Sequence, residues 1–259
     1  MALPPGTWNE PPFLPAIQEG EVHLWRADIG TTSSAVEQLS ASLGDEELSQ
    51  AQRFRFAVHR DRFIVRRAVL RSVLARYLEC DPAAIELERS AFGKPFLAPR
   101  HDSDLRFNCS HSENLALLAV TRGRAVGVDL ERIRPDFSDH AIPERFFAPR
   151  EAARLRALPA DRQPEAFFDL WVRKEAYVKA RGMGLSLALD SFEVPLGDAE
   201  PVRLLRTAPD TEEAGRWTMV SLRPAPAYPA ALVVEGQACT LHCWNWSGTP
   251  GNEDQRFSG

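Results

Sequence analysis

The order of its hydrophobic patterns is the feature that most restricts what this chain can fold into. A strand-like alternation comes first, stretches with helical spacing follow, short strand-like segments close the series, and then the same order begins again. The first series comprises residues 21–28, 33–43, 45–79, 85–89, 105–109 and 115–121. The second comprises residues 126–133, 141–158, 164–181, 191–194, 217–222, 230–235 and 240–244. This order predicts an α+β fold of two similar halves.

The same patterns suggest boundaries. We expect a proline-rich N-terminal arm over residues 1–20, an N-terminal α+β half over 21–125, a C-terminal α+β half over 126–247 and a polar tail over 248–259. The strands after the second helical stretch, 240–244 included, are expected to complete a second sheet. The helix over 45–79 is expected to break near Phe56, and Gly182 is expected to end the helix over 164–181.

The composition is that of an ordinary globular protein, with 44% apolar and 26% charged residues among 259. A net charge of -5 argues against a general nucleic-acid binder. Residues 1–20 lack the continuous apolar core of a secretion signal, and no segment approaches the length of a membrane span. Four cysteines are too few for a disulfide scaffold, so we expect reduced thiols and a cytoplasmic protein with no membrane or nucleic-acid partner.

Two short segments carry the acids that most suggest chemistry. Residues 127–131 alternate apolar and acidic side chains, so a strand there projects Asp129 and Glu131 from the same face. In the later helix, Glu175 and Lys179 lie one turn apart. Three carboxylates are hard oxygen ligands of the kind that Mg²⁺ prefers, and Mg²⁺ takes further ligands from waters and substrate phosphates. The pattern therefore predicts phosphate chemistry at a metal ion.

Both segments also have a simpler interpretation. Asp129 and Glu131 could be ordinary solvent-facing strand residues, and Glu175 with Lys179 could be a helix-stabilising pair worth about 0.2–0.5 kcal/mol. Against this, charged side chains in an otherwise hydrophobic strand cost stability unless something compensates them. The compensation expected here is a bound cation.

Two further clusters have competing interpretations. Residues 108–112 (Asn-Cys-Ser-His-Ser) end a predicted strand. Their hydroxyl, imidazole and amide groups could gather around phosphate oxygens, or Ser110 and Ser112 could cap backbone groups in a turn. Residues 239–243 hold two cysteines and a histidine, but a zinc site would need a second ligand cluster, and the alternation there suits a C-terminal strand.

Six motifs occur in order along the chain. They are Phe92-Gly93-Lys94-Pro95, Asn108 to Ser112, Gly127 to Glu131, Arg145-Phe146-Phe147, Trp171 to Lys179 and Gly182 to Ser186. With these motifs the sequence resembles the 4'-phosphopantetheinyl transferases, specifically the larger, monomeric Sfp type, from roughly Arg53 to Phe192. The resemblance implies two α+β halves with pseudo-twofold symmetry and coenzyme A bound in the cleft between them.

The resemblance also implies a role for each matching charged residue. Asp129, Glu131 and Glu175 would hold Mg²⁺ against the coenzyme A pyrophosphate. Lys174 and Lys179 would face the same phosphates.

The nucleotide end of coenzyme A would be bound by a second group of residues. His111 and Arg62 would approach the 3'-phosphate, and Lys94 and Pro95 would border the adenine nucleotide. Ser110 would contribute a polar contact nearby.

The implied reaction transfers 4'-phosphopantetheine from coenzyme A to a serine of an acyl or peptidyl carrier protein and releases adenosine 3',5'-bisphosphate. Mg²⁺ and a lysine stabilise charge on the leaving phosphate, so Asp129 and Lys179 are predicted to be catalytic. We assign removal of the serine proton to Glu175, directly or through a metal-bound water, with Glu151 as the alternative. The sequence leaves open whether the carrier serves fatty-acid, polyketide or nonribosomal peptide synthesis.

The chain departs from the family pattern at two places. Met183 stands where family members often have lysine, and the region of Glu46, Glu47 and Gln50 is one where relatives can supply lysines for the 3'-phosphate. Eight arginines lie between Arg53 and Arg76, and Arg53 or Arg55 could substitute for the missing lysines. This arginine-rich helix is open to three interpretations: a solvated face, a 3'-phosphate site or a dock for an acidic carrier protein.

Two other function classes compete with this one. A Mg²⁺-dependent nucleotidyl transferase or nuclease also clusters carboxylates, but it would need a basic groove with stacking aromatic side chains. A noncatalytic module could bind carrier proteins or coenzyme A without turnover. Every acid required for transfer is present, which argues against the noncatalytic interpretation.

Overall fold

The computed structural model describes most of the chain. The described residues are 8–12, 14–30, 32–134, 141–197, 202–208, 210 and 212–248. Much of the predicted proline-rich arm and nearly all of the predicted polar tail lie outside these ranges, so those two assignments stay predictions.

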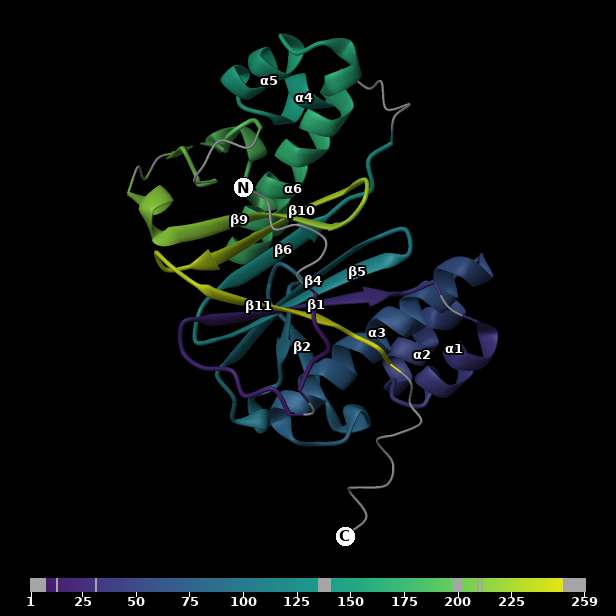
Figure 1. The fold of residues 1–259 in the computed structure, drawn as a ribbon. Coiled ribbons are helices and arrows are strands. Elements are labelled where there is room, and N and C mark those ends of the chain that lie inside the picture. The colour runs from purple at the N-terminus through teal and green to yellow at the C-terminus, as the bar shows by residue number, and fades with distance from the viewer. Residues whose placement is uncertain are drawn as a thin grey trace.

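Two β-sheets lie face to face, and helices cover their outer faces (Figure 1). The first sheet has the order β11-β1-β5-β4, with β1 at Glu21–Asp28, β4 at Leu105–Ser112, β5 at Leu115–Arg122 and β11 at Thr240–Asn245. The second has the order β6-β10-β9, with β6 at Val126–Leu130, β9 at Trp217–Ala225 and β10 at Tyr228–Glu235. Helix, sheet, sheet and helix thus follow one another through the molecule.

The helices of the first half are α1 at Ser33–Ser40, α2 at Asp45–Gln52 and α3 at Ala57–Leu78. The predicted break near Phe56 is confirmed, because residues 53–56 separate α2 from α3. Short elements follow: η2 at Pro82–Ala84, β2 at Leu87–Arg89, β3 at Pro95–Leu97 and η3 at Pro99–His101. β2 and β3 form a hairpin whose turn includes Gly93 at a φ of 83°, a conformation that glycine adopts without strain.

The second half has α4 at Ala141–Phe146, α5 at Pro149–Arg156, η4 at Ala160–Arg162 and α6 at Gln163–Arg181. The helical pattern predicted over 141–158 forms two helices, α4 and α5, because Pro149 starts a new helix at a position where a missing N–H costs nothing. Gly182, at a φ of 64°, ends α6 as predicted. The remaining elements are η5 at Gly184–Ser186, η6 at Leu189–Ser191, β7 at Phe192–Glu193, β8 at Arg206–Thr207 and η7 at Glu213–Arg216.

The two halves repeat one topology. In the first half, β5 lies between β1 and β4 and is antiparallel to both. In the second half, β10 lies between β6 and β9 and is antiparallel to both. Each half also inserts its longest helix, α3 or α6, after its first strand. The predicted α+β fold of two similar halves is therefore confirmed, and the shared strand order accounts for the pseudo-twofold relationship.

The C-terminal strand is the exception to this repeat. The prediction that residues 240–244 complete the second sheet is wrong, because β11 pairs in parallel with β1 of the first sheet. There it covers an edge of β1 whose backbone groups would otherwise lack strand partners. The chain thus leaves the second half and returns to the first, and the division into 21–125 and 126–247 as domains stays a prediction.

Because successive side chains of a strand point to opposite faces of its sheet, the layers enclose three hydrophobic cores. Leu24 and Val128 point into the core between the two sheets, whereas Trp25 points into the core beneath α3. Val233 belongs to the third core, beneath α6. Within the described ranges, no helix is both long and apolar enough to cross a membrane.

Strand β6 and helix α6 approach each other most closely at Gly127. A Cβ atom at this position would lie 2.1 Å from the carbonyl oxygen of Ala176 and 2.3 Å from the nitrogen of Ala180. Only glycine permits so close a contact between strand and helix. The packing places the C-terminal part of α6 directly over the strand that carries Asp129.

We expect Gly127→Ala to lower the free energy of unfolding by about 1–3 kcal/mol or more, because the added methyl group must push α6 away from β6. Chemical denaturation of the two proteins measures the difference. Gly215→Ala is the matched control, since a Cβ at Gly215 would meet no atom within 4 Å. Equal stability of the Gly127 and Gly215 variants would contradict the packing argument.

Candidate active site

The candidate site lies where the edges of the two sheets meet. β4 and β6 belong to different sheets, yet side chains of β4 bridge the gap between them. The side-chain oxygen of Asn108 accepts a hydrogen bond from the Val128 N–H at 2.9 Å, and the Ser110 hydroxyl donates to Asp129 Oδ1 at 2.7 Å. Alternate residues of β4 thus hold successive residues of β6 in place.

Ser112 continues this row of bridging side chains. Its hydroxyl donates to Glu131 Oε2 at 2.9 Å and accepts the Arg132 N–H at 3.0 Å. Ser110 and Ser112 therefore both orient carboxylates across the cleft. Only Ser112 also accepts a hydrogen bond from a backbone N–H, which is the role that the alternative interpretation gave to both serines.

Asp129 is the most enclosed carboxylate of the site, with 4% of its surface exposed. Lys179 Nζ lies 2.6 Å from Asp129 Oδ1 and also donates to the Ser110 hydroxyl at 2.9 Å. Asp129 Oδ2 is buried and has no hydrogen-bond partner. A buried carboxylate oxygen without a donor is costly, and a cation would compensate that cost.

Glu131 and Glu175 add negative charge to the same region. Burial raises the pKa of both carboxyl groups, and the neighbouring Asp129 raises them further. Mutual repulsion of this kind shows that Asp129, Glu131 and Glu175 share one electrostatic environment. That the three acids bind one cation stays a prediction.

The donor set fits a hard divalent cation. Three carboxylates, only partly balanced by Lys179, form the oxygen-rich environment that Mg²⁺ prefers. In the part of the chain that the structure describes, the three do not each bring an oxygen within 4.8 Å of the others, so their side chains must close to share one ion. Waters and substrate oxygens complete such sites as a rule.

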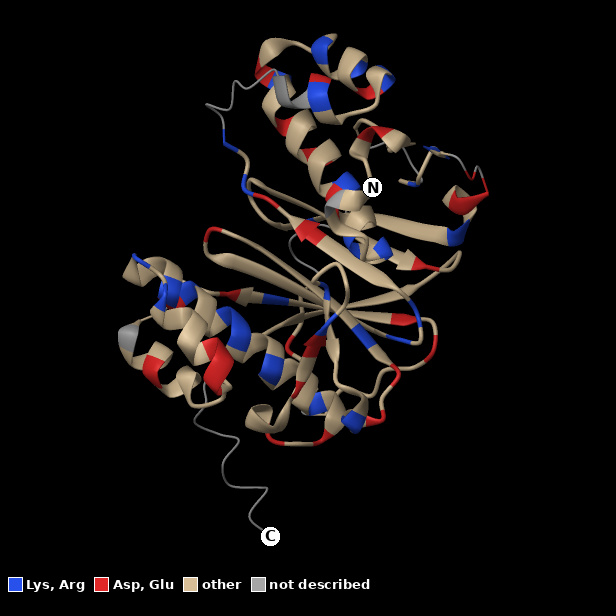
Figure 2. Ribbon diagram, turned by 180° about the vertical axis from the view of Figure 1, so that it is seen from behind, with Lys and Arg blue, Asp and Glu red and all other residues tan. Residues whose placement is uncertain are grey.

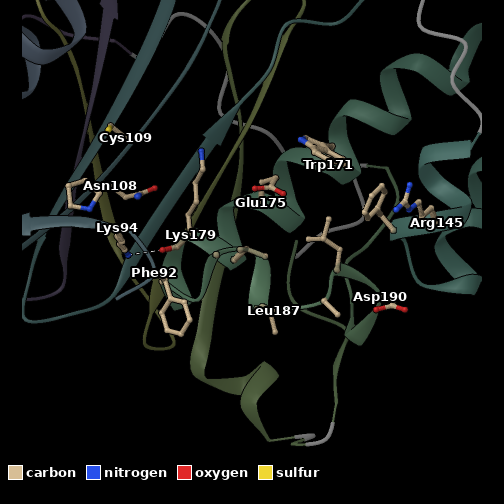
Figure 3. A pocket seen from close by; sticks show the side chains of 18 residues that line it. Phe92, Lys94, Asn108, Cys109, Arg145, Trp171, Glu175, Lys179, Leu187 and Asp190 are labelled. Atoms are coloured by element: carbon tan, nitrogen blue, oxygen red, sulfur yellow. Dashed lines mark hydrogen bonds between the residues drawn. The ribbon is translucent and has the colours of Figure 1, made fainter. Parts of the chain in front are cut away.

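A cavity of about 720 Å³ opens beside Glu175, whereas Asp129 and Glu131 do not line it. Glu175 and Lys179 of α6 stand at its centre, with Asn108 and Lys94 on one side and Arg145 on the other (Figure 3). Its volume is in the range of sites for small molecules and cofactors. Its remaining wall is largely apolar and includes Phe92, Pro95, Phe146, Trp171, Val178, Leu187 and Leu189.

Comparison with known proteins agrees with this geometry. Residues 27–123 match a family model described as 4'-phosphopantetheinyl transferase, N-terminal, and residues 125–233 match the 4'-phosphopantetheinyl transferase superfamily. The 4'-phosphopantetheinyl transferase HetI of Nostoc sp. is 40% identical over 242 residues, which cover 93% of this chain and 98% of that protein. The chain belongs to the 4'-phosphopantetheinyl transferase superfamily. It is an enzyme of the Sfp-like type.

Other relatives are more distant. The 4'-phosphopantetheinyl transferase psf-1 of Bacillus pumilus is 34% identical over 85% of this chain and 91% of its own length. The transferase Sfp of Bacillus subtilis is 32% identical over 62% of this chain and 69% of its own. Among solved structures, the holo-[acyl-carrier-protein] synthase of Thermotoga maritima aligns with a TM-score of 0.34 at 21% identity, over 44% of this chain and 63% of that one.

In this transferase, Lys94 and Pro95 both line the cavity, at the start of β3. The Lys94 ammonium, however, donates to the carbonyl oxygens of Val126 at 2.8 Å and Lys179 at 2.7 Å. Burial, with a smaller effect of Arg106, lowers the pKa of Lys94 to about 8. Lys94 therefore fastens the β2–β3 hairpin to β6 and to the end of α6.

The predicted 3'-phosphate residues lie on the first half. Arg62 Nε donates to the Asn114 side-chain oxygen at 3.0 Å, in the turn between β4 and β5. His111 lies 3.0 Å from a guanidinium nitrogen of Arg66. Desolvation, then Arg66, Lys179 and Arg62, lower the pKa of His111 to about 4, so three cations face this imidazole. A positive region of this kind attracts an anion.

Arg66, which contacts His111, was not singled out from the sequence. It lies four residues after Arg62, on the same face of α3, and this spacing is the signal that could have identified it. Figure 2 shows basic residues, which are all arginines in the sequence, along the helices of the first half.

Other arginines of α3 have structural partners. Arg67 forms an ion pair with Glu47, and Arg71 Nε lies 2.6 Å from Glu47 Oε2. Although burial acts in the opposite direction, the two guanidinium groups lower the pKa of Glu47. The departure from the family pattern at Glu47 is thus an internal contact that joins α2 to α3.

The prediction that Lys174 faces the phosphates is wrong. Its side chain is 0% exposed, and its ammonium lies 2.7 Å from Glu151 Oε2 and donates to the carbonyl oxygens of Leu189 and Phe192. Lys174 follows Arg173 and precedes Glu175, so helical geometry turns it about 100° away from the acid that lines the cavity.

Glu151 is likewise excluded as the base. Besides Lys174, its carboxylate accepts the N–H groups of Ala148 at 2.9 Å and Val194 at 2.8 Å. With 3% of its surface exposed, it has no access to a substrate hydroxyl. Glu151 and Lys174 form a buried ion pair that connects α5, α6 and the start of β7.

Lys174→Met is expected to destabilise the protein by about 3–5 kcal/mol, because it leaves Glu151 charged and buried without its partner. Thermal and chemical denaturation measure the loss. The double variant Lys174→Met, Glu151→Met should recover part of it, since neither buried charge remains. A wild-type denaturation midpoint for the single variant would mean that Lys174 is not a structural ion-pair partner.

Proposed function

We propose that this enzyme transfers the 4'-phosphopantetheine group of coenzyme A to a serine of an acyl or peptidyl carrier protein in the presence of Mg²⁺, releasing adenosine 3',5'-bisphosphate. One observation carries the proposal: Asp129 keeps one buried oxygen free of hydrogen bonds, and Lys179, which contacts its other oxygen, lines a cavity together with Glu175. The names of the relatives point to the same reaction.

The three acids and Lys179 would have different roles at the phosphates. Asp129, Glu131 and Glu175 are the residues that would hold Mg²⁺, which when bound supplies positive charge to the phosphate oxygens. Lys179, with 29% of its side chain exposed, reaches the cavity while its ammonium rests on Asp129. It would stabilise negative charge on the leaving phosphate without giving up a proton.

Glu175 is the residue best suited to receive the proton of the carrier serine. It lines the cavity, and burial together with Asp129 raises its pKa, which makes its carboxylate a stronger base than an ordinary glutamate. Among the two acids considered for this role, only Glu175 has access to a substrate.

The nucleotide end would bind to the first half. Arg62, Arg66 and His111 surround a positive region that suits the 3'-phosphate. Pro95 and the aliphatic part of Lys94 would border the adenine, since the Lys94 ammonium is engaged with the backbone. Ser110 would act indirectly, by holding Asp129 and Lys179.

We also propose that the enzyme acts as a monomer, without nucleic acid or membrane. Both sides of the cleft come from one chain, β4 from the first half and β6 and α6 from the second. A second copy is therefore not needed to complete the site.

Glu175→Gln should reduce transfer by about 100-fold or more, because the amide cannot accept the serine proton and is a poorer metal ligand. Intact-mass measurement of an apo carrier protein incubated with enzyme, coenzyme A and Mg²⁺ reports the gain of one phosphopantetheine group. Chromatography of the same mixture identifies adenosine 3',5'-bisphosphate. Near-normal transfer by the variant would refute the assignment of Glu175.

Glu165→Gln is the matched control for this experiment. Glu165 lies on the same helix but is exposed, and its contact is to Arg223 at 3.7 Å. Its variant should transfer at the wild-type rate. Removal of Glu175 should not unfold the protein, since the neutral amide relieves repulsion with Asp129.

As the pH is lowered, the affinity for Mg²⁺ should begin to fall at a higher pH than it would at a site of ordinary carboxylates. The pKa values of Glu131 and Glu175 are raised, so protons compete with the metal above the usual range of a glutamate. Calorimetry should detect proton release on Mg²⁺ binding at mildly acidic pH and none at alkaline pH. An affinity that stays constant through mildly acidic pH would show that these carboxylates do not bind the ion.

A further inference from the structure

A second cluster of metal-ligand side chains lies away from the cavity, on β1 and β11. Each of Glu21, His23 and His242 offers one ligand atom, and these atoms lie within 4.8 Å of one another. His23 Nε2 is 3.5 Å from Glu21 Oε2, and His242 Nε2 is 3.5 Å from Glu21 Oε1. The pairing of β1 with β11 sets His23 directly opposite His242.

These separations suit a metal ion better than direct hydrogen bonds. A distance of 3.5 Å is long for a hydrogen bond. Two atoms bound to one tetrahedral Zn²⁺, at about 2.0–2.1 Å each, lie about 3.4 Å apart. Two imidazole nitrogens and one carboxylate form a ligand set for Zn²⁺ and related transition ions, whereas Mg²⁺ prefers oxygen ligands alone.

We propose that Glu21, His23 and His242 bind a divalent transition-metal ion such as Zn²⁺, and that this ion fastens β11 to β1. The ion leaves a fourth position for water, as three protein ligands do in other zinc sites. This site is independent of the proposed transfer reaction, because the Mg²⁺ ligands come from β6 and α6.

The surroundings of His23 provide the support that a metal ligand needs. Its other ring nitrogen, Nδ1, lies 2.8 Å from the Tyr77 hydroxyl, which also accepts the Trp25 indole N–H at 2.9 Å. A ligating histidine usually places its second nitrogen against such a partner, which fixes the ring orientation. Burial lowers the pKa of His23 to about 4, so the imidazole is uncharged at neutral pH.

Glu21 and His242 give the ion a path from solvent. Side-chain exposure is 21% for Glu21 and 38% for His242, against 4% for His23. Glu21 Oε2 accepts the Gln18 N–H at 2.9 Å, which limits the rotation of its carboxylate. The cluster therefore has one buried, fixed imidazole, one carboxylate held by Gln18, and one more exposed imidazole through which an ion can enter.

A metal at this position would join the first and last strands of the described fold. β11 returns from the second half to pair in parallel with β1, and Asn9 adds an isolated bridge to Trp244 of β11. Ligands on both strands tie residues 21 and 242 together directly. Binding to the folded state alone then stabilises it by mass action.

Titration of the purified full chain with Co²⁺ or Zn²⁺, in excess Mg²⁺, tests the proposal. We expect one Co²⁺ to bind with a visible spectrum of nitrogen and oxygen ligands, and Zn²⁺ to raise the unfolding temperature and slow hydrogen exchange in residues 240–245. His242→Gln and Glu21→Gln should each weaken binding at least tenfold and abolish both effects. Absence of binding to the wild-type protein would overturn the proposal.

Controls separate this site from other ligands of the chain. Asp129→Asn should bind Co²⁺ as the wild type does, which excludes the carboxylates of the cleft, and His59→Gln, at an exposed histidine of α3, should be unchanged. A thiolate-to-cobalt charge-transfer band would assign the ion to cysteine. That result, or equal binding by His242→Gln and the wild type, would refute the site.

Discussion

The contact between β6 and α6 at Gly127 is the constraint on which the site depends. A strand and a helix normally keep the distance that their side chains require, but here the backbone of α6 rests on a residue without a side chain. Lys179 can therefore place its ammonium on Asp129, and Glu175 enters the same electrostatic environment. A wider spacing would leave these groups in separate surroundings.

Excess negative charge at the cleft is held in place by the opposite half. Ser110 and Ser112 of β4 donate to Asp129 of β6 and to Glu131, which directly follows β6. Lys179 balances part of the charge, and Asp129 Oδ2 remains without a partner. The carboxylates thus lower the stability of the fold by their mutual repulsion, which a divalent cation would relieve. Sites that bind substrates commonly contain such locally unfavourable groups.

Sequence patterns located the acids but not every direction in which side chains point. Asp129 was identified because a charged side chain in a hydrophobic strand is unusual. Glu175 was identified because it belongs to a motif of the family that the sequence resembles. Lys174, adjacent to Glu175, was placed at the phosphates, but one residue along a helix changes the direction by about 100° and buries it against Glu151. Arg66 was missed because it is one of eight arginines in one region, and no local pattern shows that its guanidinium group contacts His111.

By itself the sequence determined the strand and helix order, the two similar halves and the acids of the cleft, since these follow from local periodicity and short motifs. Tertiary structure alone decided where β11 pairs, because edge pairing joins segments separated by more than two hundred residues. For the same reason His242 had no visible partner in the sequence, where a second ligand cluster was lacking. His23 and Glu21 supply that cluster only when β1 and β11 lie side by side.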